Sequence, residues 1–302
     1  MKKGTIIAIV VAILMILAGG ILLIMGLSFA GDNIQENTLT EQVIQIIPVS
    51  ESFDSVVIDT KDCDVKFMLY NGDVDGQITF LQTEAVTHSV QIEDGTLKIE
   101  MIDNRKWTDR IHISGLYGQA EKMEMTVYLP NTHYASIQVT TDTGDVKIPG
   151  VLAAEELLLR SDTGDVWLEG GPIEKLDCMV STGDITVRGG QGMFMKLRTN
   201  TGKLDIRDVT AQELHLGIDT GRAMVKNAVV PVFTVNGGTG DVELENVQAE
   251  DYLQVFTDTG DINIENSDAP DINIESSTGD IFVPAAWQFQ RIETGTGSIK
   301  FE

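Results

Sequence analysis

A threonine–glycine pair recurs nine times between residues 143 and 297, at almost constant spacing. The pairs are Thr143-Gly144, Thr163-Gly164, Thr182-Gly183, Thr201-Gly202, Thr220-Gly221, Thr239-Gly240, Thr259-Gly260, Thr278-Gly279 and Thr296-Gly297. Their glycines are 18 to 20 residues apart. Self-similarity at a fixed period of this length is the signature of repeat architectures. The pairs therefore predict a series of equivalent structural units, with the glycine at a turn.

Apolar residues alternate with polar ones on both sides of each glycine. Leu157 and Leu159 precede Gly164, and Val166 and Leu168 follow it, and the other repeats keep this pattern. Alternation with a period of two indicates two strands, each with one buried face. Six residues after the glycines stand Gly150, Gly170, Gly189, Asp208, Asn227, Asn246 and Asn266, with Ala285 as the exception. These residue types tolerate positive φ, so they predict a second corner in each coil.

A single coil of about 19 residues is too small to be stable. Burial of about five apolar side chains contributes ~10 kcal/mol, whereas ordering the coil costs ~20–35 kcal/mol. Stacked coils add hydrogen bonds between parallel strands about 4.8 Å apart and cover each other's core. The predicted fold class is therefore all-β, a parallel β-solenoid (β-helix) whose coils have two or three short sides.

The chain begins with a long uncharged segment. No charged residue occurs between Lys3 and Asp32, and Ile6–Phe29 contributes 24 mostly apolar residues. A helix of that length spans about 36 Å, enough to cross a bilayer. Because Lys2 and Lys3 precede it, we expect a cytoplasmic amino terminus and an extracytoplasmic remainder. The alternative is a cleaved signal peptide ending near Ala30.

The predicted organisation has four parts. Residues 1–31 form the cytoplasmic tip and transmembrane anchor, 32–49 a polar stalk, 50–136 an irregular β cap, and 137–302 the regular solenoid. Within the cap, residues 56–67 resemble a degenerate coil with Cys63 at the glycine position, and residues 90–101 form a coil or a hairpin around Asp94-Gly95. Cys63 and Cys178 fall several coils apart, too far for a disulfide, so we expect two free thiols.

At this point the chain resembles a known family. The amino-terminal membrane segment, the "YLP" strand at 128–130 and the tandem TGD(V/I)xI repeats resemble the bacterial "putative adhesin" family of unknown function. Related domains occur in Lia-type envelope-stress proteins. The resemblance covers roughly residues 50–302 and implies a membrane-anchored solenoid at the cell surface. It implies no catalytic residues.

Acidic residues recur beside each glycine and raise the question of calcium binding. The candidate ligands are Asp142, Asp145, Asp162, Asp165, Asp258 and Asp261. The alternative is structural, because aspartate in turns accepts hydrogen bonds from nearby backbone N–H groups. Lys203, Arg222 and Ser298 interrupt the acidic column that directly follows the glycines, and the column two residues before them is interrupted by Ser181, Asn200, Gly238, Ser277 and Gly295. These interruptions favour the structural interpretation and predict no metal site. By strand parity, the threonines preceding the glycines are expected to point inward.

A basic island interrupts the acidic surface. Its members are Arg188, Lys196, Arg198, Lys203, Arg207, Arg222 and Lys226. The net charge of the whole chain is −25, which argues against nonspecific binding to nucleic acid or anionic lipid. Pairs with acids on neighbouring coils would explain the island structurally. The alternative is a site for an anionic envelope polymer or an acidic protein surface.

No catalytic motif of the common hydrolases, metalloproteases or nucleotide-binding proteins occurs in the chain. We therefore expect neither an enzyme nor a cofactor. A glycan-cleaving solenoid is the least favoured hypothesis. The leading hypothesis is a single-pass cell-surface module for adhesion or envelope stress. Its alternative is a structural scaffold that polymerises end to end through the final coil, which carries Ile299 and Phe301.

Overall fold

The computed structural model describes residues 43–70, 76–105, 123–150 and 152–302. The predicted anchor (1–31) and the first part of the stalk (32–42) lie outside the described residues. Within the described ranges, no helix is long and apolar enough to cross a membrane.

The cap begins with seven strands. They are β1 (Val43–Val49), β2 (Ser55–Thr60), β3 (Cys63–Tyr70), β4 (Gly76–Gln82), β5 (Val86–Glu93), β6 (Thr96–Asp103) and β7 (Met123–Pro130). Strand β4 pairs antiparallel with both β1 and β7, and β5 pairs antiparallel with β6. The prediction of a stalk up to residue 49 is wrong for Val43–Val49, because alternate residues of this segment, Ile47 and Val49, turn toward the core.

The β2–β3 segment forms the first parallel coil, as the sequence predicted. Strand β2 pairs parallel with β6 and β8, and β3 pairs parallel with β7 and β9. Residues 90–101 form a hairpin, one of the two predicted alternatives, and its turn places Asp94 and Gly95 at positive φ. Cys63 and Cys178 are both free, as predicted. Both are also buried, which raises the pKa of each thiol to about 12.

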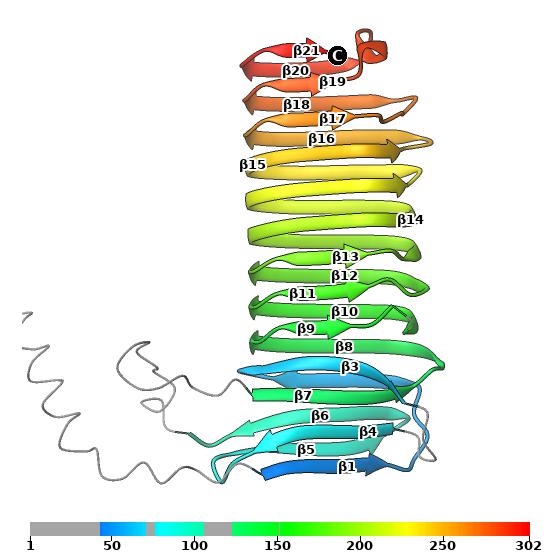
Figure 1. Cartoon of the computed structure of the whole chain (residues 1–302), viewed down its shortest axis with the longest axis vertical. Helices are drawn as coiled ribbons and strands as arrows, with labels where there is room; N and C mark the ends of the chain where they lie inside the picture. The colour runs from blue at the N-terminus through cyan, green and yellow to red at the C-terminus, as the bar shows by residue number, and fades with distance from the viewer. Residues whose placement is uncertain (1–42, 71–75, 106–122, 151) are drawn as a thin grey trace, which may run out of the picture. The chain divides into compact units, whose positions relative to one another are not determined.

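The regular solenoid follows from β8 to β21, and Figure 1 shows its strands stacked as successive layers. The elements are β8 (His133–Thr143), β9 (Val146–Ile148), β10 (Ala153–Thr163), β11 (Val166–Glu169), β12 (Ile173–Thr182), β13 (Ile185–Arg188), β14 (Gln191–Val229), β15 (Val232–Gln248), β16 (Tyr252–Thr259), β17 (Ile262–Glu265), β18 (Ile272–Thr278), β19 (Ile281–Val283), the 3₁₀ helix η2 (Ala285–Trp287), β20 (Arg291–Thr296) and β21 (Ile299–Phe301). Every pairing among β8–β21 is parallel and joins equivalent residues of neighbouring coils, for example Leu157 with Ile137 and Leu176. The predicted β-solenoid of about 19-residue coils is confirmed.

The first corner requires glycine for two independent reasons. From Gly164 onward the corner glycines have φ between +138° and +153°, which L side chains rarely adopt. A Cβ at any of the nine positions would lie 1.6–2.2 Å from the carbonyl oxygen of the residue one coil earlier. The second corner has the predicted positive φ at Gly189, Asp208, Asn227, Asn246 and Asn266, whereas Gly150 and Gly170, in the first two regular coils, do not have it.

The predicted orientation of the threonine column is wrong. All nine threonines that precede the glycines are exposed. The inward hydroxyls belong to residues three positions before the glycine: Thr199 donates to the carbonyl of Gly183 at 2.8 Å, and Ser276 to that of Gly260 at 3.2 Å. Parity fails at this point because the bend leaves two successive residues facing outward. The alternation therefore loses its phase between the two strands.

Candidate binding face

The basic island divides between two sides of the solenoid. One outward face is formed by β13 and by two segments of β14, residues 203–207 and 222–226. It carries Arg188, Lys203, Arg207, Arg222 and Lys226. We call these five residues the basic band. Lys196 and Arg198 lie instead on the stack formed by β12 and the first part of β14, where their partners are Asp177 and Met179.

Three cations of the basic band surround Asp205. Lys203, Asp205 and Arg207 alternate along β14, so all three side chains point outward from the same strand. Arg188 is the register partner of Arg207 on the preceding coil. Asp205 accepts hydrogen bonds from Arg188 at 2.7 Å and from Arg207 at 2.9 Å, and the Lys203 Nζ lies 3.6 Å from its carboxylate. Sequence analysis named the cations and missed this carboxylate as their common partner.

The neighbouring guanidinium groups control the protonation of Asp205. Burial by itself would raise the pKa of this carboxyl, but hydrogen bonds from Arg188 and Arg207 hold the pKa well below its usual range. The Asp205 side chain is only 9% exposed, whereas those of Lys203 and Arg207 are each 38% exposed. Asp205 is therefore a buried anion, and the cations around it outnumber it and remain partly accessible to solvent.

The later edge of the basic band is neutralised by the next coil. Arg222 contacts Asp241 at 3.2 Å and Glu243 at 3.5 Å, and Lys226 pairs with Glu245. These pairs confirm the prediction of bridges between coils at this edge. The surplus positive charge consequently lies on the side of Arg188, Lys203 and Arg207.

The aspartates beside the corner glycines form a hydrogen-bonded ladder. The Asp145 carboxylate accepts the N–H of Asp165 at 2.9 Å, Asp165 accepts that of Asp184 at 2.8 Å, and Asp261 accepts that of Asp280 at 2.8 Å. Asp142, Asp162 and Asp258 are exposed beside them. Across the described parts of the chain, no group of three or more His, Cys, Asp or Glu side chains is arranged to hold a metal ion. This geometry supports the structural interpretation of the acidic columns.

Comparison with known proteins gives a family. The DUF4097 family, described as Toastrack DUF4097, matches residues 53–230 and 218–300. The chain belongs to the DUF4097 Toastrack family. Solved structures described as "putative adhesin" are among those similar to this chain. No curated protein matches the chain.

Three solved structures resemble this DUF4097 chain at low identity. A "putative adhesin" from Parabacteroides merdae is 14% identical with a TM-score of 0.48, and one from Bacteroides fragilis is 14% identical with a TM-score of 0.46; both alignments cover 87% of this chain and 97% of the other. A "putative lipid binding protein" from Parabacteroides distasonis is 14% identical, with a TM-score of 0.37 and coverage of 86% and 94%.

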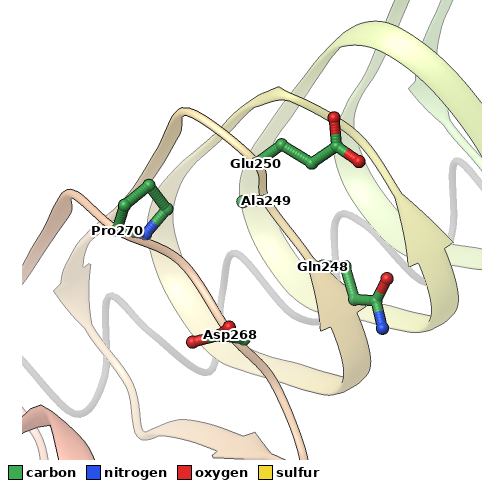
Figure 2. Close-up of a pocket in the computed structure, with 5 residues that line it drawn as sticks. All are labelled: Gln248, Ala249, Glu250, Asp268 and Pro270. Carbon is green, nitrogen blue, oxygen red and sulfur yellow. The ribbon is translucent and has the colours of Figure 1, made fainter.

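Two shallow hollows on this Toastrack solenoid were not predicted. Figure 2 shows the larger, with a volume of about 460 Å³, lined by Gln248, Ala249, Glu250, Asp268 and Pro270. The carboxylates of Glu250 and Asp268 extend in different directions (Figure 2), so they do not converge on a common ligand position. The second hollow, of about 340 Å³, lies on the face of the basic band and is lined mainly by acids, among them Asp241, Asp261 and Glu265.

Proposed function

We propose that this Toastrack protein is a noncatalytic binding module of the bacterial envelope. Residues 6–29 anchor it in the membrane, the solenoid stands on the extracytoplasmic side, and the basic band binds a phosphate-bearing envelope polymer. The apolar amino-terminal segment supports the anchor, because a helix of 24 such residues is long enough to span a bilayer. The proposal needs neither nucleic acid nor a cofactor.

A single observation carries the binding role: Arg188, Lys203 and Arg207 share one carboxylate. Arginine guanidinium groups bind phosphate oxygens in pairs, and Arg188 and Arg207 lie on adjacent coils in register. Asp205 holds both guanidinium groups in position, which reduces the entropy lost when a ligand binds. Since the rest of the chain is strongly acidic, a polyanion is repelled elsewhere and attracted at this band.

The test is binding of poly(glycerol phosphate) teichoic acid to the full chain. Replacing Lys203, Arg207 and Arg222 by glutamine removes three exposed positive charges from the band. We expect binding to weaken at least tenfold and its dependence on salt to become shallower. Arg188 is left unchanged in this variant because it keeps Asp205 paired.

The matched control replaces Lys175, Lys196 and Arg198 by glutamine. This variant has the same net charge, but the three changes lie on the other side of the coils. We expect its binding to remain close to that of the wild type. Equal loss in both variants would show that only net charge matters and would remove the site from the proposal.

End-on self-association is the second candidate. Phe289, shortly before β20, is 89% exposed, and Phe301, the last residue of β21, is 44% exposed. Large exposed aromatic side chains are typical of protein contacts. Sedimentation over a hundredfold range of concentration, with a Phe289→Ser variant for comparison, distinguishes this scaffold from a monomeric module.

A further inference from the structure

The cap carries an apolar outer surface that the proposed polymer site does not use. We call it the cap face, and it consists of the outward side chains of β1, β4, β7 and β3. Its apolar and aromatic members include Ile44, Ile46, Leu81, Tyr128, Met68 and Tyr70. Ile44 is 66% exposed and Ile46 is 58% exposed, unusually high values for isoleucine in a strand.

Strand register places these side chains on one continuous surface. Ile44 is opposite Leu81 across the β1–β4 ladder. Tyr128 is opposite Met68 across the β3–β7 ladder, and Gln77 joins the two halves by pairing with Tyr128. Residues directly opposite in a ladder point to the same side of the sheet, so these side chains share one face with the polar Gln77, Thr79 and Thr126 that lie between them.

The cap face differs in charge from the rest of the protein. Among the outward residues of its four strands, the charged ones are Asp64, Lys66 and Glu124, all on β3 and β7. Strands β1 and β4 contain no charged residue in a chain whose net charge is −25. The part of the cap face formed by β1 and β4 is therefore uncharged and carries exposed apolar side chains, which is characteristic of a surface covered by a partner.

The position of β1 in the sequence indicates what covers it. The uncharged segment 6–29 ends 13 residues before β1 begins. A chain of 13 residues reaches at most about 45 Å, so β1 lies within that distance of the membrane surface if the segment is the anchor, nearer than the later coils need be. Tyrosine at the edge of an apolar face also suits the headgroup region of a bilayer.

We propose that the cap face lies on the outer surface of the lipid bilayer, with Ile44 and Ile46 inserted at headgroup depth. This inference rests on the proposed membrane anchor. The contact is hydrophobic and independent of lipid charge, because β1 and β4 are uncharged. It turns this side of the cap toward the membrane, and the basic band lies farther along the same sheet, beyond β9 and β11.

The experiment uses the full chain reconstituted in phosphatidylcholine vesicles. An environment-sensitive fluorophore is attached to an Ile46→Cys variant, and a Gln212→Cys variant, exposed on another side of the solenoid, is the matched control. The native Cys63 and Cys178 are buried with raised pKa values, so they do not compete for the label. We expect nitroxide-bearing lipid to quench the label at position 46 and aqueous iodide to quench the label at position 212.

Each other outcome overturns the inference. Equal access of iodide to both labels shows that the cap face is in water. Protection of position 46 from both quenchers shows that protein covers it, either a second copy or another segment of the chain. Lipid quenching that occurs only with phosphatidylglycerol and disappears in high salt assigns the contact to the basic band. Failure of the unlabelled chain to float with vesicles would separately remove the anchor itself.

Discussion

The hydroxyl of Thr199 donates a 2.8 Å hydrogen bond to the carbonyl oxygen of Gly183, one coil earlier. Thr199 is fully buried, whereas Thr220, which precedes the corner glycine of the next coil, is exposed. Threonine therefore has two different roles at this corner of the coil: three residues before the glycine it is buried, and directly before the glycine it is exposed.

Thr199→Val and Thr220→Val test this difference. Valine at 199 removes the hydroxyl and leaves the buried Gly183 carbonyl without that donor, so we expect a loss of about 1–2 kcal/mol in the free energy of unfolding. Valine at 220 faces water and should change stability by less than about 0.5 kcal/mol. Urea denaturation of both variants measures the difference, and a larger loss at 220 would contradict the orientation of the column.

The corner glycines should not tolerate a side chain. At Gly221 a Cβ would lie 1.8 Å from the Gly202 carbonyl oxygen, and φ is +138°. Neighbouring coils cannot separate without breaking their hydrogen bonds, so we expect Gly221→Ala to cost more than about 3 kcal/mol or to prevent folding.

Gly189→Asn is the matched control for Gly221→Ala. Gly189 has φ of +71°, and a Cβ there would meet nothing within 4 Å. Asparagine already occupies the equivalent position at Asn227 and Asn246, also at positive φ. We expect thermal unfolding of this variant to resemble that of the wild type, and a collapse comparable to Gly221→Ala would contradict the steric argument.

Replacing Asp205 should affect stability and binding in opposite directions. Asp205→Asn leaves Arg188, Lys203 and Arg207 close together without their shared anion. We expect a loss of about 2–3 kcal/mol, somewhat less than for a fully buried ion pair, because the cations are partly exposed. The variant loses the carboxylate that positions Arg188 and Arg207, but the positive charge it adds to the basic band outweighs this loss for a polyanion, so teichoic-acid binding should strengthen.

The pH dependence of Asp205 has a definite sign. Its pKa in the folded protein is lower than in the unfolded chain, so its stabilising effect is complete above the unfolded value near 4 and is lost as the pH falls further. The Asp205→Asn variant should therefore lose less stability on acidification than the wild type. Parallel pH profiles for the two proteins would contradict this assignment.

The environment of His88 in the cap predicts a second group whose protonation destabilises the fold at low pH. The residue is 8% exposed, its ring lies 4.3 Å from that of Phe80, and neither ring nitrogen has a hydrogen-bond partner within the described part of the chain. Burial lowers the pKa of His88 to about 4. The neutral form is thus favoured in the fold, and stability decreases by up to about 3 kcal/mol as the pH falls from about 6.5 to 4.

A His88→Phe variant removes this titration and keeps an aromatic ring beside Phe80. We expect the difference in unfolding free energy between wild type and variant to change steadily between pH 6.5 and 4. A difference that is constant over this range would show that His88 is not protonated on unfolding.

The sequence by itself determined the repeating coil and both of its corners. Glycine at 18–20-residue intervals and Asp or Asn six residues later are local requirements of backbone conformation, so they can be read without knowing what lies beside them. The same holds for the buried strand positions such as Leu157 and Leu159, because alternation within one strand fixes its inner face.

Only the tertiary structure decided what happens across a corner and between coils. A bend shifts the phase of the alternation, which is why the threonines face outward although strand parity placed them inside. The basic island divided for a related reason, because cations that are close in sequence point to different sides of a coil. Stacking brings Arg188 within 2.7 Å of Asp205, 17 residues away, and this contact depends on the register between coils rather than on either residue's neighbours in the chain.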